Sequence, residues 1–171
     1  PAASVNPTSH SLTTNSLMVK FVENELLSIR KEIRDMWTLV YEQLDNAYKS
    51  LLETDIELAA QVAAREKRVN AFELKIDSDI EDFIALYNPV AVDLRFSLAM
   101  LKINNNLERI GDYADSIARF VVRTEPQPTD RELFERLKLR EMYETALNML
   151  KTTMESLEMQ DIAKAKSVFE I

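Results

Sequence analysis

The sequence is poor in residues on which several large classes of protein depend. Its 171 residues include one glycine, one histidine and no cysteine. A single glycine is too few for the glycine-rich loops that bind nucleotide phosphates, and it leaves an all-β fold short of residues for tight hairpins. Without cysteine there is no disulfide scaffold and no thiolate metal site. These absences exclude disulfide-rich domains and disfavour nucleotide-binding and all-β folds.

The charge is predominantly acidic, and long hydrophobic runs are missing. The chain has 29 Asp and Glu against 21 Lys and Arg, a formal net charge of -8. Such a balance argues against a general nucleic-acid binder. No apolar run approaches the roughly 18 residues that a membrane helix requires. We therefore expect a soluble protein without membrane insertion, and the lack of cysteine is compatible with a reducing, cytoplasmic location.

The first part of the chain differs in composition from the rest. Residues 1–17 contain no Lys, Arg, Asp or Glu and are rich in Ser, Thr and Asn. They lack the basic start and the apolar centre of a secretory signal. We predict that they form a flexible tail or a remnant of cloning or processing, and we assign no function to His10.

After residue 18, apolar residues recur every three or four positions, which is typical of amphipathic helices. We predict helices over residues 21–53, 55–87, 88–122 and 130–158, with another that begins at Asp161. A capping box from Thr54 to Glu57 begins the second helix. Asn88 and Pro89 supply the cap and the first-turn proline of the third. We predict that the Pro-rich residues 124–129 form a linker.

A shift of 106 residues aligns the first helical region with the last. The aligned pairs are Met36 with Met142, Leu44 with Leu150, Ser50-Leu51 with Ser156-Leu157, Asp55-Ile56 with Asp161-Ile162, Ala59 with Ala165 and Val62 with Val168. Two amphipathic helices can also match in this way by chance. A true repeat predicts an all-α fold of tandem three-helix bundles. Residues 18–123 would form the first bundle, and residues 130–171 the start of a second that is incomplete in this chain.

Two Glu-x-x-x-Asp motifs lie on successive predicted helices. Glu73 and Asp77 belong to the second helix, and Glu108 and Asp112 to the third. An i, i+4 pair places both carboxylates on one helical face. Carboxylates that approach one another need protons, a basic neighbour or a metal ion, and oxygen ligands suit Mg, Mn, Ca or iron. The alternative is that each pair belongs to an ordinary solvated face.

The two motifs differ in their predicted direction. At about 100° per residue, Glu73 falls inside the apolar stripe of its helix, whereas Glu108 and Asp112 point roughly 120° or more away from theirs. The predicted stripe of the third helix is Phe96, Met100, Ile103, Leu107, Ile110, Ala114, Ile117 and Val121, and its polar face includes Ser97, Asn104, Asn105 and Asp115. We therefore expect a site at the edge or surface of the bundle.

Two further features of the third helix are uncommon in a helix interior. Gly111, the chain's only glycine, costs about 1 kcal/mol relative to alanine, which the close approach of another backbone or of a ligand could offset. The run Asn104-Asn105-Asn106 is unusual because asparagine competes with the backbone for hydrogen bonds. This run is either functional or simply exposed polar surface.

Residues that support catalysis are scarce. There is no usable histidine, no cysteine nucleophile, and none of the Glu-x-x-His pairs of ferritin-like di-iron bundles. We therefore expect no enzymatic activity. A carboxylate-bridged metalloenzyme is the remaining catalytic alternative.

Four segments carry a family resemblance. They are Arg68-Val-Asn-Ala-Phe-Glu-Leu-Lys-Ile-Asp77, Asn88-Pro-Val-Ala-Val-Asp-Leu-Arg95, Lys102-Ile103 and Leu107-Glu-Arg-Ile-Gly-Asp-Tyr-Ala114. With these segments the chain resembles the PhoU family of phosphate-uptake regulators over about residues 20–123. The remainder resembles the start of the family's second repeat in pattern only.

The resemblance implies a cytoplasmic protein of tandem three-helix bundles that represses phosphate transport and the phosphate-starvation response through protein contacts. The implied partners are the ATPase subunit of the phosphate ABC transporter and a sensor histidine kinase. A homodimer is a further expectation, because bundle faces often self-associate.

The resemblance also implies metal binding by the Glu-x-x-x-Asp motifs. The implied ligands are Glu73, Asp77, Glu108 and Asp112, and the implied ions are iron, zinc or other metals, with Mn and Mg also suited to carboxylates. Two departures bear on this site. Asn106 stands where family members often have Asp, and position 179, which the shift aligns with Glu73, lies beyond Ile171. An alternative within the resemblance is the cytoplasmic PhoU-like domain of a sodium-phosphate cotransporter.

Overall fold

The computed structural model describes the backbone of residues 8–124 and 131–171 and the side chains of residues 19–124 and 132–171. Within these residues the regular structure is entirely helical. The elements are α1 (Thr8–Glu53), α2 (Ile56–Tyr87), α3 (Ala91–Arg123), α4 (Arg131–Arg136), α5 (Leu139–Met159), α6 (Ile162–Ser167) and a short 3-10 helix, η1 (Val168–Glu170). The all-α prediction is confirmed.

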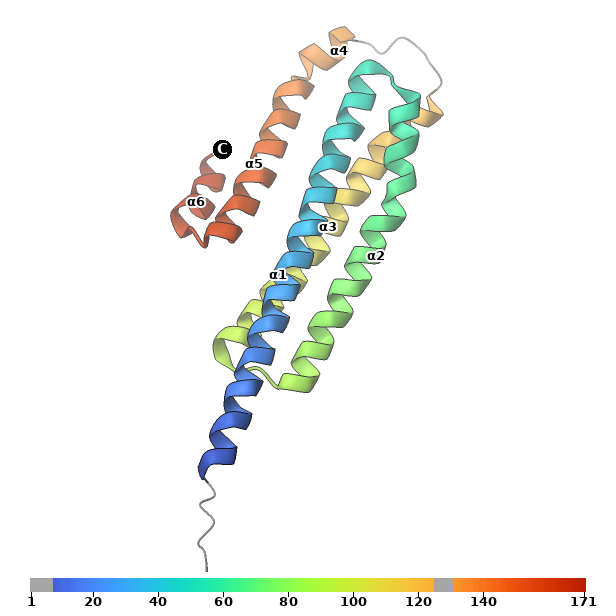
Figure 1. Cartoon of the computed structure of the whole chain (residues 1–171). Helices are drawn as coiled ribbons and strands as arrows, with labels where there is room; N and C mark the ends of the chain where they lie inside the picture. The colour runs from blue at the N-terminus through green and yellow to red at the C-terminus, as the bar shows by residue number, and fades with distance from the viewer. Residues whose placement is uncertain (1–7, 125–130) are drawn as a thin grey trace, which may run out of the picture.

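The helices α1, α2 and α3 pack side by side as a long antiparallel bundle (Figure 1). Core residues on each helix are spaced at alternating steps of three and four, so that one stripe faces the other two helices. The fully buried side chains of this core include Ile29, Ile33, Met36, Val40, Val69, Ile76, Ile80, Phe83, Met100 and Leu107. The first predicted three-helix unit is therefore present.

The helix α1 begins thirteen residues earlier than residue 21, where the sequence pattern places its start. It thus includes residues 8–17 of the segment that we expected to be a flexible tail, while residues 1–7 lie outside the described residues. Ser, Thr and Asn are only mildly unfavourable in a helix, and extending a formed helix is far easier than nucleating a new one. A lack of charge is therefore a poor indicator of where this helix begins.

The buried stripe of α3 differs from the predicted one. Met100, Leu107, Ala114 and Val121 are buried as expected, but the residues that alternate with them in the buried stripe are Ser97, Asn104, Gly111 and Ala118. The expected Phe96, Ile103, Ile110 and Ile117 are only half-buried and lie beside the core. Small side chains allow the neighbouring helices to come close, and the large apolar residues then cover the flanks. The stripe is therefore rotated toward the face that the sequence pattern predicts to be polar.

Gly111 lies at one of these close approaches. A Cβ atom built on it would be 2.9 Å from Cγ1 of Val69 on α2. Val69 is itself buried and, because it is β-branched, has little rotamer freedom. The glycine thus permits contact with a side chain of the neighbouring helix, which accounts for its position without a ligand.

The turns between the helices use different caps from those predicted. Asp55, not Thr54, is the N-cap of α2, and its carboxylate accepts a hydrogen bond from the amide of Leu58 at 2.9 Å. Asn88 ends α2 in the left-handed conformation, and its backbone N–H donates a hydrogen bond to the carbonyl of Ile84. The N-cap of α3 is Val90, which has no side-chain cap. Asn is one of the few residues that tolerate the left-handed region, so it suits a helix end as well as a helix start.

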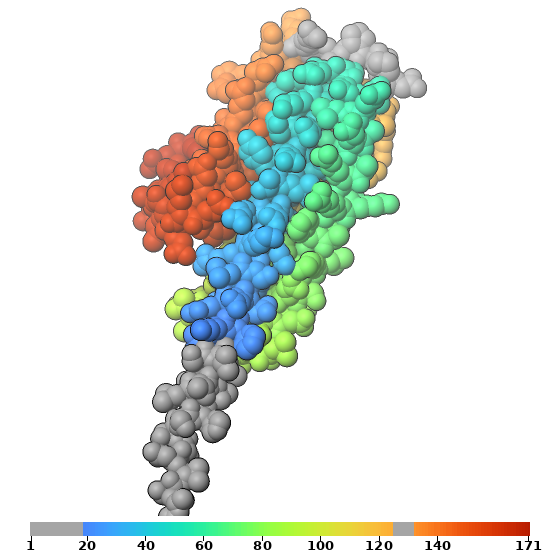
Figure 2. Space-filling view, in the orientation of Figure 1, coloured from blue at the N-terminus to red at the C-terminus, as the bar shows by residue number. Residues whose placement is uncertain are grey.

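The region predicted as one helix over residues 130–158 is divided. Lys138 adopts a left-handed conformation between α4 and α5. The helix α5 lies against α1 on the outside of the first bundle (Figures 1 and 2). The indole of Trp37 donates a hydrogen bond to the carbonyl of Leu150 at 3.2 Å, and the rings of Tyr48 and Tyr143 stack with centroids 3.5 Å apart.

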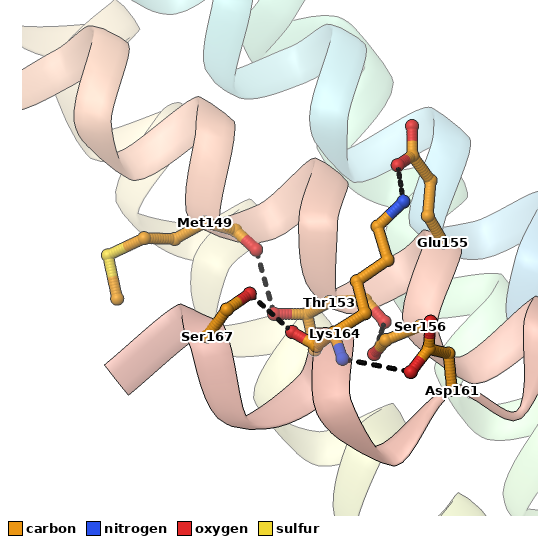
Figure 3. Close-up of polar contacts among 7 residues, drawn as sticks. All are labelled: Met149, Thr153, Glu155, Ser156, Asp161, Lys164 and Ser167. Atoms are coloured by element: carbon orange, nitrogen blue, oxygen red, sulfur yellow. Dashed lines mark hydrogen bonds and ion pairs between the residues drawn. The ribbon is translucent and has the colours of Figure 1, made fainter. Parts of the chain in front are cut away.

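The 106-residue repeat is visible in the two helix turns that it relates. Asp161 caps α6 through the amide of Lys164, as Asp55 caps α2, and Figure 3 shows this bond. The residues before these caps, Thr54 and Gln160, are both left-handed, with φ of 56° and 53°. The amides of Asp55 and Asp161 each bond to the carbonyl of the serine five residues earlier, both at 2.9 Å. This agreement supports a second repeat that begins in α5 and α6.

None of the described helices combines the length and the apolar character needed to cross a membrane.

Candidate cation site between α2 and α3

Acidic residues occupy positions of the α2 stripe that would otherwise be apolar. Glu66 and Glu73 alternate with the buried Val62, Val69 and Ile76 at steps of three and four along the helix. Both glutamates are half-buried. The prediction that Glu73 lies in the apolar stripe is therefore correct, and Glu66, which sequence reasoning did not select, shares its register.

Two contacts fix the level at which α2 faces α3. The side chain of Asn104 reaches the carbonyl of Glu73 and the carboxylate of Asp77, and Gly111 lies against Val69. Because the helices are antiparallel, Glu108 stands between these contacts at the level of Glu73. The structure thus brings Glu73 and Glu108 to the same level of adjacent helices, whereas Asp77 and Asp112 lie one turn away from this level in opposite directions.

The predicted site residues differ in exposure. Glu73, Asp77 and Glu108 are half-buried, whereas Asp112 is exposed. The rotation of the α3 stripe places Glu108 closer to the core than the sequence predicts. These residues lie at the edge of the bundle, as expected, and with Glu66 we call them the acidic cluster: Glu66, Glu73, Asp77, Glu108 and Asp112.

Glu73 and Glu108 are held in an environment that disfavours their charged forms. Burial and the adjacent Asp77 raise the pKa of Glu73 above its usual range. Burial raises the pKa of Glu108 as well, assisted by the charge of Asp112, a hydrogen bond with Asp112, and the charges of Glu73 and Glu66. The influence of Glu73 and Glu66 on Glu108 shows that the cluster interacts across the two helices. A bound cation would relieve this repulsion.

Several buried oxygen atoms of α2 and α3 accept no hydrogen bond from the part of the chain that the structure describes. They are Oδ1 of Asn70, Oδ1 of Asn104 and Oδ1 of Asp115. An acceptor that is removed from water and left unpaired costs free energy, so such atoms suit a cation or an ordered water.

The oxygen donors suit a hard cation, but the carboxylates do not form a complete coordination shell. Among the described residues, no three His, Cys, Asp or Glu side chains are placed so as to hold one ion. An ion here would be bound by fewer carboxylates, with neutral oxygens and water completing its shell, as Mg²⁺ and Ca²⁺ often are. The candidate carboxylates for such an ion are Glu73, Asp77, Glu108 and Asp112, no three of which are placed around a common point among the described residues.

Comparison with known proteins decides the family. Residues 33–121 match the model of the PhoU domain, which is slightly more than half of the chain and includes both motifs. The chain belongs to the PhoU family. The resemblance to this family in the sequence motifs is therefore confirmed.

Three relatives of this PhoU chain indicate how far the similarity extends. It is 41% identical over 95 residues to the phosphate-specific transport system accessory protein PhoU of Serratia marcescens, covering 56% of this chain and 39% of that protein. It is 31% identical to the protein of the same description from Escherichia coli, covering 93% of this chain and 65% of the relative. The homolog from Aquifex aeolicus is 32% identical, and the match covers 85% of this chain and 65% of that protein.

A solved structure supports the fold. The phosphate transport system regulatory protein PhoU from Streptococcus pneumoniae matches with a TM-score of 0.75 at 25% identity, over 86% of this chain and 68% of that one. The chain spans between 39% and 65% of the length of the curated relatives named above.

Proposed function

We propose that this chain belongs to an accessory protein that represses phosphate transport and the phosphate-starvation response. Its membership of the PhoU family carries this proposal, and its relatives are described as accessory proteins of the phosphate-specific transport system. The long α1–α3 bundle supports it, because such a body offers extended faces for protein contacts.

The protein acts in the cytoplasm by binding partners and catalyses no reaction of its own. The proposed partners are the ATPase subunit of the phosphate ABC transporter and a sensor histidine kinase, and the protein itself is proposed to form a homodimer.

Uptake of labelled phosphate tests the role in transport. Deleting the full-length native gene should raise uptake in phosphate-rich medium, and restoring the gene should lower it again. Unchanged uptake after deletion would contradict repression of transport.

The finer part of the proposal is that Glu73, Asp77, Glu108 and Asp112 bind a metal ion such as Mn²⁺, Mg²⁺, iron or zinc. The shared level of Glu73 and Glu108, their raised pKa values and the unpaired oxygen of Asn104 support it. The bound ion would neutralise like charges at the α2–α3 interface. The chain's own contribution is to hold oxygen donors on two rigid helices.

Metal analysis of the purified protein tests this site. The protein should retain bound cations after gel filtration, and Glu108→Ala with Asp112→Ala should lower the amount. Glu81→Ala with Asp82→Ala is the matched control, because it removes two exposed carboxylates from α2. Equal metal content in all three proteins would remove the acidic cluster from the account.

A further inference from the structure

Asn104 is the one fully buried member of the Asn104-Asn105-Asn106 run. Its side chain has no solvent exposure, whereas Asn105 and Asn106 are exposed. It occupies a core position of α3 between Met100 and Leu107, where an apolar residue would pack without needing a hydrogen-bond partner. Burial of an amide at such a position requires an explanation.

The amide nitrogen of Asn104 makes two hydrogen bonds to α2. It donates to the carbonyl of Glu73 at 2.9 Å and to Oδ1 of Asp77 at 2.7 Å. The first bond anchors the amide to the backbone of the facing helix, and the second restrains a carboxylate of the acidic cluster. These bonds connect Asn104 to both members of the α2 motif.

The other end of the amide has no partner. Oδ1 of Asn104 is buried and accepts no hydrogen bond from any described residue. An unpaired buried oxygen costs free energy, so this amide is not the most stable choice for a contact between two helices. The arrangement secures Asp77 at the expense of one unpaired acceptor.

We infer that Asn104 is a positioning residue of the cation site, which holds the Asp77 carboxylate at the α2–α3 interface by donating a hydrogen bond to it. This inference rests on the proposed metal binding and adds to it a residue outside the Glu-x-x-x-Asp motifs. Hydrogen bonds to a ligating carboxylate fix its orientation, and their loss typically reduces metal affinity about 10- to 100-fold.

Titration of the metal-free full chain with Mn²⁺ tests the inference. Asn104→Ala should weaken Mn²⁺ binding at least about 10-fold. Asn106→Ala is the matched control, because Asn106 is exposed on the same helix and bonds only to Lys102 and Arg109 of α3. Its affinity should equal that of the unmodified protein. If Asn104→Ala does not fold, Asn104→Ser replaces it in the same titration. Serine leaves a smaller cavity than alanine, because its hydroxyl fills part of the space.

A double-mutant cycle with Asp77→Asn separates positioning from a general loss of packing. If Asn104 acts through Asp77, then Asn104→Ala should have little further effect on Mn²⁺ affinity once Asp77→Asn is present. Additive effects, or an Asn104→Ala protein that binds as tightly as the unmodified one, would overturn the inference and leave the metal site standing. Failure of the unmodified protein to bind Mn²⁺ would instead overturn the cation site itself.

Discussion

At the scale of single residues, the composition of α2 and α3 is explained by what each position faces. Glu66 and Glu73 occupy core-register positions of α2, and Asn104 and Gly111 occupy core positions of α3. The sequence motifs identify Glu73 as unusual without any structure. They do not identify Asn104, because a polar residue in a polar run looks exposed until the rotation of its helix is known. The unusual run of three asparagines points to this segment, and the heptad spacing of Asn104 from Ser97 and Gly111 is the signal that separates it from its two neighbours.

Neutralising Glu108 should stabilise the metal-free protein near neutral pH. Because the folded-state pKa of Glu108 is raised, the folded chain holds that proton more tightly than the unfolded chain does. Its contribution to stability is therefore largest below the ordinary glutamate pKa and is lost as the pH rises through the raised value. Glu108→Gln should raise the thermal midpoint at pH 7 by the equivalent of less than about 1 kcal/mol, since the site is only half-buried and screened.

Thermal melts in the presence of a chelator check this prediction at pH 7 and pH 4. The difference between Glu108→Gln and the unmodified protein should shrink at pH 4, where the native glutamate is protonated. The exposed Glu81→Gln on α2 serves as the control and should change little. A Glu108→Gln protein that melts lower than the native one at pH 7 would contradict the repulsion described for the acidic cluster.

At the scale of the helices, hydrophobic periodicity predicts where elements exist better than where they begin. It places α2 and α3 almost correctly, but it misses the start of α1 and the break at Lys138. Periodicity reports which face is apolar, whereas a boundary depends on a few backbone angles. The Asn88-Pro89 pair shows this, since the same asparagine can start one helix or end another.

The two repeat-related caps should differ in their importance to folding. Asp55→Ala should lower the free energy of unfolding by about 1 kcal/mol, because α2 is part of the central core. Asp161→Ala should leave global unfolding almost unchanged, because α6 contributes no buried residue. Urea denaturation measures the first effect, and faster amide exchange confined to α6 measures the second. An equal loss of global stability in both variants would contradict the separate roles of these helices.

At the scale of the whole molecule, the first bundle is a complete packing unit and α5 is attached to one side of it. Leu150 belongs to the central core and accepts the hydrogen bond of Trp37, the chain's only tryptophan. The tandem arrangement could be predicted because the sequence repeats with a fixed shift. How α5 lies on α1 could not, since that placement depends on contacts between residues more than a hundred positions apart.

Leu150→Ala should loosen α5 from α1 while leaving the α1–α3 bundle folded. Removing a buried leucine side chain typically costs about 2 kcal/mol or more, and here the loss falls on the docking of α5. The Trp37 fluorescence should shift to longer wavelength, and amide exchange should increase across residues 139–159. Met149→Ala, at a more exposed position of the same helix, is the control. Unchanged fluorescence and exchange in Leu150→Ala would contradict the packing described for α5.

The central claim is that this PhoU family chain represses the phosphate-starvation response and that its acidic cluster takes part. Secreted phosphatase activity in phosphate-rich medium tests it most directly. The activity is measured in a strain that lacks the full-length native gene. It is also measured in the same strain carrying either the native gene or a double variant with both Glu73→Gln and Glu108→Gln. We predict high activity in the deletion strain, low activity with the native gene and raised activity with the variant. Low activity in the deletion strain would contradict the regulatory role, and full repression by the variant would contradict the part assigned to the acidic cluster.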